Sequence, residues 1–88
     1  MSDKLFMRLA KSIGDEDLEL GIFLGLTESA IKAIRADSRS VVTCIFHILT
    51  TWRRQKLIPN SMRVFQELCD AFTDLGRADL VDHITRGE

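Results

Sequence analysis

The sequence has little of what a catalytic or metal-binding site requires. It contains two histidines and two cysteines, and they do not stand at the spacings that zinc ligands use. Neither His47 nor His83 has a nucleophile and an orienting carboxylate at a useful spacing, and there is no glycine-rich phosphate loop or pair of catalytic acids. We therefore predict that the chain is not an enzyme and has no catalytic, cofactor-binding or metal-binding residues.

An excess of charge of one sign and a long apolar run are also missing. Twelve basic and thirteen acidic residues give a formal net charge of −1, which offers no general attraction to nucleic acid. No apolar run approaches the roughly 20 residues that span a bilayer, and the first residues lack the apolar core of a signal peptide. We expect no nucleic-acid partner and no membrane contact by this domain.

The two cysteines, Cys44 and Cys69, both fall within apolar helical patterns. Reduced thiols in the core are the favoured interpretation, and a disulfide between the two is the alternative. Because reduced thiols are typical of the cytoplasm, this interpretation predicts a cytoplasmic location.

What the sequence does have is apolar residues at helical spacing. In a chain of 88 residues this pattern predicts one all-α domain, residues 1–88, with a core of about 3–86. The six predicted helices are about 3–13, 15–23, 28–36, 39 or 40 to 54, 60 or 61 to 75, and 78–85. Gly14 and Gly76 are predicted to follow the ends of the first and fifth helices, and Thr27 to cap the third.

The fourth predicted helix has the widest apolar stripe, which is typical of a central helix buried on much of its circumference. Its stripe consists of Val41, Ile45, Ile48, Leu49 and Trp52. Across the whole chain, the residues expected to lie deepest in the core are Leu9, Ile45, Trp52, Leu68 and Phe72.

Three segments resemble parts of a known family. They are LGLTESAI at 24–31, ILTTWR at 48–53, and LCDAFTDLG at 68–76 followed by ADLV at 78–81. In this order and spacing they resemble the death domain, a six-helix antiparallel bundle of apoptotic and innate-immune signalling. The resemblance extends from about residue 5 to residue 84, and its first segment matches the junction between the family's second and third helices. It implies a death-domain-like fold.

One position departs from the family. Death domains usually have a tryptophan early in the second helix, and the matching residue here is Asp17. The core beside this helix must therefore be filled differently. The related caspase-recruitment and death-effector folds are the alternatives, although Trp52 favours the death domain.

The resemblance implies a function in binding other death-domain proteins, in homotypic or heterotypic association, with no catalysis. Family interfaces often join an acidic patch around helices two and three to a basic patch around helices one and four. The acidic candidates are Asp15, Glu16, Asp17 and Glu19, and the basic candidates are Lys4, Arg8, Lys11, Arg53, Arg54 and Lys56. Opposite patches on one molecule would permit head-to-tail assembly. The alternative is that these charges are ordinary solvated helix faces and compensation of helix dipoles.

The second predicted helix also has apolar residues on two sides. Leu18 and Ile22 point away from Leu20 and Phe23, so they either pack into the core or form an apolar docking patch. Gly21, inside the same helix, suggests close backbone packing.

Two other functions stay open from sequence alone. The domain could pack against a neighbour within a longer protein, including the intracellular part of a receptor. It could also be a nucleic-acid-binding helical module that uses Lys32 and Arg35, which the balanced charge disfavours.

Overall fold

A computed structural model describes residues 2–58 and 61–86, and six helices make up the regular structure of these residues. They are α1 (Asp3–Ile13), α2 (Asp17–Phe23), α3 (Glu28–Asp37), α4 (Val41–Arg54), α5 (Met62–Asp74) and α6 (Ala78–Thr85). The predicted all-α fold is confirmed, and α1 and α6 have the predicted bounds. The other boundaries differ by at most two residues. Of the two predicted starts of the fifth helix, Asn60 lies outside the described residues.

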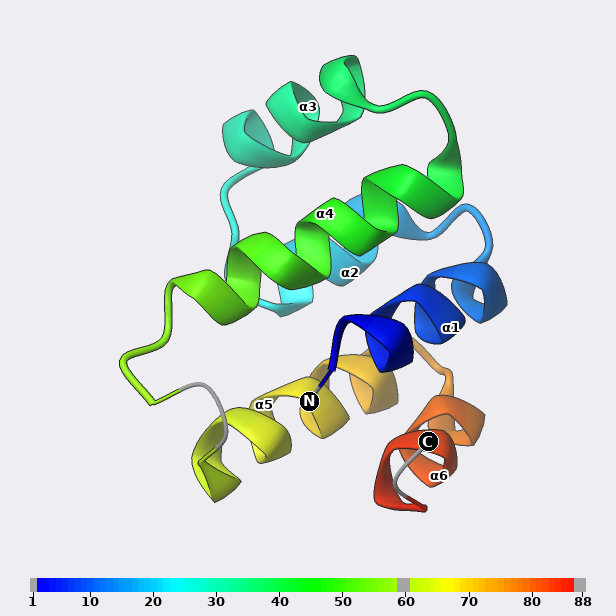
Figure 1. Cartoon of the computed structure of the whole chain (residues 1–88), viewed down its shortest axis with the longest axis vertical. Coiled ribbons are helices and arrows are strands. Elements are labelled where there is room, and N and C mark those ends of the chain that lie inside the picture. Colours follow the sequence, from blue (N-terminus) through cyan, green and yellow to red (C-terminus); the bar gives the residue numbers. More distant parts are fainter. Residues whose placement is uncertain (1, 59–60, 87–88) are drawn as a thin grey trace.

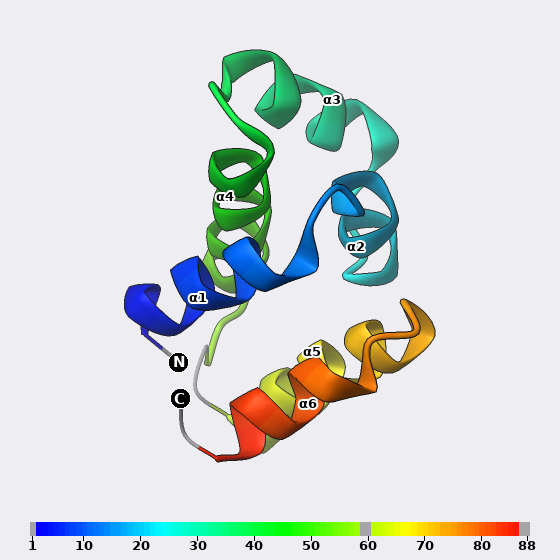
Figure 2. The same ribbon diagram turned by 90° about the vertical axis from the view of Figure 1, so that its right-hand side faces the viewer.

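Helix α4 lies at the centre of the bundle. It contacts α1, α2 and α3, which are arranged around it in Figure 1. Figure 2 shows α5 and α6 side by side beneath α1, with α6 folded back along α5. Because α6 also contacts α1, and α5 contacts α2, this pair closes the bundle on the side away from α3.

Side-chain caps fix the starts of four helices. In each case the side-chain oxygen accepts a hydrogen bond from the backbone N–H three residues ahead, at 3.1 or 3.2 Å. A cap of this kind contributes about 1 kcal/mol. The four cap residues are Ser2, Thr27, Ser40 and Ser61. The predicted cap at Thr27 is confirmed.

Two glycines follow the ends of α1 and α5, as predicted. Gly14 has a φ of 84° and Gly76 a φ of 82°, in the region that residues with a Cβ atom rarely adopt. The chain therefore leaves α1 toward α2, and α5 toward α6, in sharp turns that glycine permits without steric cost.

Trp52 occupies the core with no exposed surface, and all five residues expected deepest in the core are at most 1 % exposed. The Trp52 indole Nε1 is buried and has no hydrogen-bond partner among the described residues, so the ring rather than its N–H group stabilises the fold. The expectation for Val41 is wrong, because its exposure is 44 %. It is the first residue of α4 and borders an open hollow between α3 and α4.

Helices α2 and α3 approach closely at Gly21. A Cβ atom on this residue would lie 2.6 Å from Cδ1 and 2.7 Å from Cγ1 of Ile31. Ile31 is the residue of α3 that is completely buried. The close packing that the sequence suggested at Gly21 is therefore present, and the absence of a Cβ atom there makes room for the Ile31 side chain that anchors α3.

We predict that Gly21→Ala lowers the free energy of unfolding by about 1–3 kcal/mol, because the new methyl group overpacks the contact with Ile31. The loss should appear even though alanine is intrinsically favoured over glycine in helices by about 1 kcal/mol. Urea denaturation followed by circular dichroism measures it. The same substitution should cost less in an Ile31→Val background, which lacks Cδ1. An equal cost in both backgrounds would show that the contact with Ile31 is not the cause.

Candidate protein-interaction surfaces

Asp17 is a buried residue, which contradicts its predicted place in an exposed acidic patch. It is 5 % exposed. Its Oδ2 accepts hydrogen bonds from Nε of Arg35 at 3.0 Å and from the thiol of Cys44 at 3.4 Å, and it lies 2.9 Å from Nη2 of Arg35. A buried carboxylate is tolerated only when it is paired and hydrogen-bonded in this way. At the position where the family places a tryptophan, this chain therefore has a polar link between α2, α3 and α4.

Glu16 is half-buried, and it too is engaged within the molecule. The Arg77 guanidinium lies 3.4 Å from Glu16 and donates to the backbone oxygens of Ile13 at 3.2 Å and Ser12 at 2.8 Å. It also pairs with Asp79 at 3.2 Å, and this hydrogen bond lowers the pKa of the Asp79 carboxyl. Arg77 thus satisfies carbonyl groups that the end of α1 leaves without helical partners, and joins that end to the start of α6.

Of the four acidic candidates, the other two, Asp15 and Glu19, are exposed. Asp15 lies in the connection before α2, and Glu19 lies on α2. Their exposure fits the predicted interaction role, and that role stays a prediction.

The six basic candidates also divide into two groups. Four are exposed: Lys4, Arg8 and Lys11 on α1, and Arg54 at the end of α4. Arg53 and Lys56 have side chains that are only 22 % and 24 % exposed. Both lie over aromatic rings of the core as well as pairing with carboxylates, so part of their positive charge is used inside the protein.

The two half-buried cations have similar surroundings. Arg53 pairs with Asp3, and its guanidinium lies 4.7 Å from the centre of the Phe6 ring. Lys56 lies 2.8 Å from a Glu67 carboxylate oxygen and 5.7 Å from the centre of the Trp52 ring. Removing either cation would therefore disturb core packing as well as surface charge.

The apolar candidates on α2 differ in burial. Leu18 is partly buried against the core, whereas Ile22 is 45 % exposed. Phe23, which the sequence analysis placed on the other side of the helix, is 44 % exposed. The exposed apolar surface of α2 is therefore Ile22 with Phe23. They lie three and four residues after Glu19, which places all three on one helix face, but this spacing does not tell whether that face is buried or exposed.

A second set of exposed apolar residues was missed by sequence reasoning. Leu57 is fully exposed, Ile58 is 68 % exposed and Met62 is 82 % exposed. They lie around the connection between α4 and α5, next to Lys56 and Arg54. Met62 is the first residue of α5 and Leu57 and Ile58 precede that helix, so helical periodicity does not reveal which of them are exposed.

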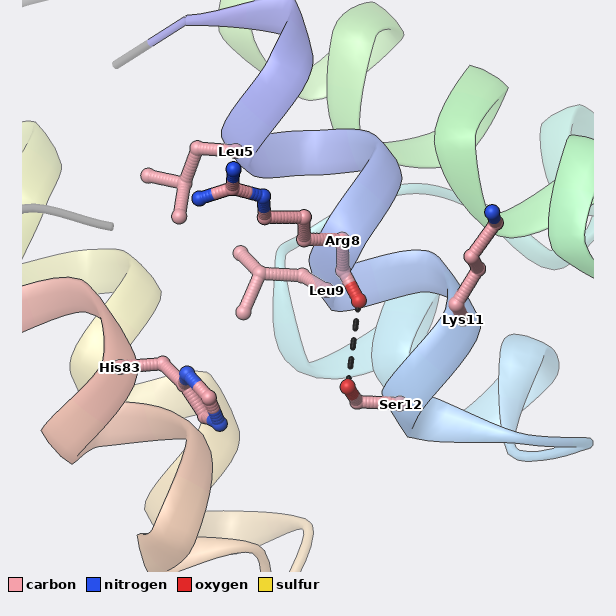
Figure 3. Close-up of a pocket in the computed structure, with 6 residues that line it drawn as sticks. All are labelled: Leu5, Arg8, Leu9, Lys11, Ser12 and His83. Atoms are coloured by element: carbon pink, nitrogen blue, oxygen red, sulfur yellow. Dashed lines mark hydrogen bonds between the residues drawn. The ribbon is translucent and has the colours of Figure 1, made fainter.

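Helices α1 and α6 border a groove of about 350 Å³ (Figure 3). Its floor is formed by Leu5 and Leu9, which are 6 % and 1 % exposed, and Arg8 and Lys11 lie along its edges. In Figure 3 the His83 side chain points from α6 toward α1, near Ser12, whose hydroxyl donates to the backbone oxygen of Arg8 at 3.1 Å. A second hollow, of about 410 Å³, lies beside Asp17 and Cys44 between α3 and α4.

Both cysteines are buried free thiols, as the sequence analysis favoured. Burial and then the hydrogen bond to Asp17 raise the pKa of the Cys44 thiol. Burial and then the charge of Asp70 raise the pKa of the Cys69 thiol. Residues 2–58 and 61–86 contain no group of three histidine, cysteine or acidic side chains arranged to hold a metal ion. In the same residues, no helix combines the length and the apolar character needed to cross a membrane.

A family model described as Death domain matches residues 3–88, essentially the whole chain. No curated protein and no solved structure matches the chain.

Two charge reversals on α2 should have different effects on stability, because one carboxylate is buried and the other is exposed. We predict that Asp17→Lys lowers the free energy of unfolding by about 3 kcal/mol or more, because it places an ammonium group in a buried site beside Arg35. Glu19→Lys makes the same change of charge at an exposed position and should alter stability by about 0.5 kcal/mol or less. Urea denaturation of both variants tests this, and similar losses in both would contradict the pairing of Asp17.

The raised pKa values of Cys44 and Cys69 predict slow thiol chemistry in the folded protein. Below the ordinary cysteine pKa of 9.0, each thiol has less reactive thiolate when folded than when unfolded, and burial also blocks access. Modification by a maleimide at pH 8 should therefore be at least about tenfold slower in the folded than in the urea-unfolded chain. Mass spectrometry after timed quenching gives the two rates, and equal rates would contradict the burial of the thiols.

Proposed function

The chain belongs to the death domain family, a family of non-catalytic protein-interaction modules, and we propose that it associates with other death domains through exposed charges of opposite sign. The association is homotypic, with copies of this chain, or heterotypic, with death domains of other proteins.

The observation that carries this proposal is the separation of exposed charges. Asp15 and Glu19 lie at α2, and the exposed cations Lys4, Arg8 and Lys11 lie on α1. Arg54 ends α4, the helix that packs against α1. Exposed charges of this kind steer encounter and select partners more than they add affinity.

The biological setting that we propose is apoptotic or innate-immune signalling of the NF-κB type, in the cytoplasm or in the cytoplasmic part of a receptor. Family membership is the support for this setting. The two free thiols are compatible with a reducing compartment.

A nucleic-acid-binding function has less support. Its candidate residues are on α3, where Arg35 pairs with Asp17 and Lys32 lies 3.3 Å from Glu28. Carboxylates thus accompany both cations and reduce the positive potential that phosphate binding needs. Packing against a neighbouring domain of a longer protein is the other alternative, and it predicts an isolated domain that binds no separate death domain.

We predict that reversing both exposed acids, in Asp15→Lys with Glu19→Lys, weakens binding to a partner death domain by about tenfold or more, since like charges would then face each other. Pull-down against a panel of death domains at several salt concentrations identifies the partner. Titration by surface plasmon resonance then gives the affinity and its salt dependence.

Asp74→Lys on α5 is the matched control, because it changes an exposed acid in the same way at another place. It should bind as the unmodified chain does. Both the double variant and this control should have the melting temperature of the unmodified chain. Undiminished binding by the double variant would rule out the charge-paired interface. Failure of the unmodified domain to bind any death domain would rule out the proposed function.

A further inference from the structure

The connection between α4 and α5 has three apolar side chains that the core does not use. Leu57 is fully exposed, Met62 is 82 % exposed and Ile58 is 68 % exposed. The other exposed large apolar side chains of the described residues are at most 45 % exposed. Large apolar side chains that stand this far into solvent are characteristic of a contact with something outside the protein. We call these three residues the apolar tip.

The structure holds the apolar tip in a defined position from both sides. Lys56 turns inward, because its Nζ lies 2.8 Å from Oε1 of Glu67 and 5.7 Å from the centre of the Trp52 ring, and the residues that follow it project outward. The backbone N–H of Ser61 donates to the backbone oxygen of Ile58 at 3.2 Å, and the Ser61 side chain caps α5. In Figure 1 the chain that follows α4 runs out to the left-hand edge of the molecule, so the tip projects from the body of the bundle.

The charges that flank the apolar tip are positive. No acidic residue occurs in the sequence between Asp37 and Glu67, and Glu67 itself is paired with a lysine. The tip lies within this stretch. Arg54 at the end of α4 and Arg63 directly after Met62 are both exposed. Apolar side chains next to cations, with no carboxylate between them, are complementary to a partner that is both apolar and anionic.

The surface of a bilayer that contains anionic lipids has both of these properties. Basic side chains are attracted to its negative surface potential, and apolar side chains enter the region at the boundary of the headgroups and the acyl chains. A lipid surface also accepts side chains that project freely, whereas a protein partner needs a packed pocket to bind each of them. Anionic lipids of this kind are present in the cytoplasmic leaflet.

We propose that the apolar tip docks this domain on membranes that contain anionic lipids. Leu57, Ile58 and Met62 enter the interface, and Arg54 and Arg63 contact the headgroups. The contact is peripheral, and it does not depend on the proposed function. It departs from the expectation of no membrane contact, which rested on the lack of a spanning or signal segment, because the insertion of a few side chains requires neither.

Co-sedimentation with vesicles tests the proposal, using phosphatidylcholine alone and phosphatidylcholine mixed with phosphatidylserine. The unmodified chain should bind the mixed vesicles at least about tenfold more strongly, and rising salt should reduce the difference. Leu57→Ser with Ile58→Ser removes apolar insertion, and Arg54→Gln with Arg63→Gln removes the flanking charge. Each double variant should bind the mixed vesicles about tenfold or more weakly than the unmodified chain does.

Ile22→Ser with Phe23→Ser is the matched control, since it removes two exposed apolar side chains that lie near Glu19 instead of near cations. It should bind the mixed vesicles as the unmodified chain does. The two tip variants should have the melting temperature of the unmodified chain, because all four substituted positions are exposed.

A second measurement reports insertion directly. The indole introduced by Leu57→Trp should emit at shorter wavelengths on mixed vesicles than in buffer, while the buried Trp52 gives a constant background. Three results would overturn the proposal: no preference for the anionic vesicles, normal binding by either tip variant, or unchanged emission of the introduced indole. Loss of binding to a partner death domain by the serine double variant, measured without vesicles, would assign the tip to a protein partner and would also overturn it.

Discussion

Burial of α4 is the constraint on which the rest of the structure depends. Its apolar stripe needs cover on several sides, and α1, α2 and α3 provide it around Ile45, Ile48 and Trp52, which have no exposed surface. An indole N–H without a partner is tolerated there because the packing around the ring outweighs its cost. Once α4 occupies the interior, exposed charges such as Lys4, Lys11 and Glu19 lie on the outer helices around it.

The helices and the core were predictable because both follow from local spacing. Thr27, Gly14 and Trp52 have the roles that the sequence assigned to them, since capping, turn formation and apolar periodicity each depend on a few neighbouring residues. The charged residues were predictable only in part. The burial of Asp17 depends on Arg35 and Cys44, which lie 18 and 27 residues further along the chain. Such long-range partners have no local sequence signal.

Long-range partners also explain why the acidic and basic patches contain fewer exposed residues than the sequence predicted. Arg53 and Lys56 were assigned to a basic surface, but Asp3 and Glu67, together with the rings of Phe6 and Trp52, hold them against the core. The candidate charges that stay exposed, among them Glu19 and Lys11, form a smaller set than the sequence indicated. The exposed pair on α2 was hidden by a different effect. A seven-residue helix makes fewer than two full turns, so its spacing alone does not define one buried face.

The linkage made by Arg77 has a consequence for how interfaces in this domain are mapped. Its guanidinium binds the last carbonyls of α1 and two carboxylates, and so sets how α1 and α6 stand relative to each other. Replacing it would change the width of a groove to which its own side chain contributes no lining. An alanine variant of Arg77 would then alter this groove without removing any side chain that lines it, so a loss of binding in that variant would report on helix geometry rather than on a direct contact.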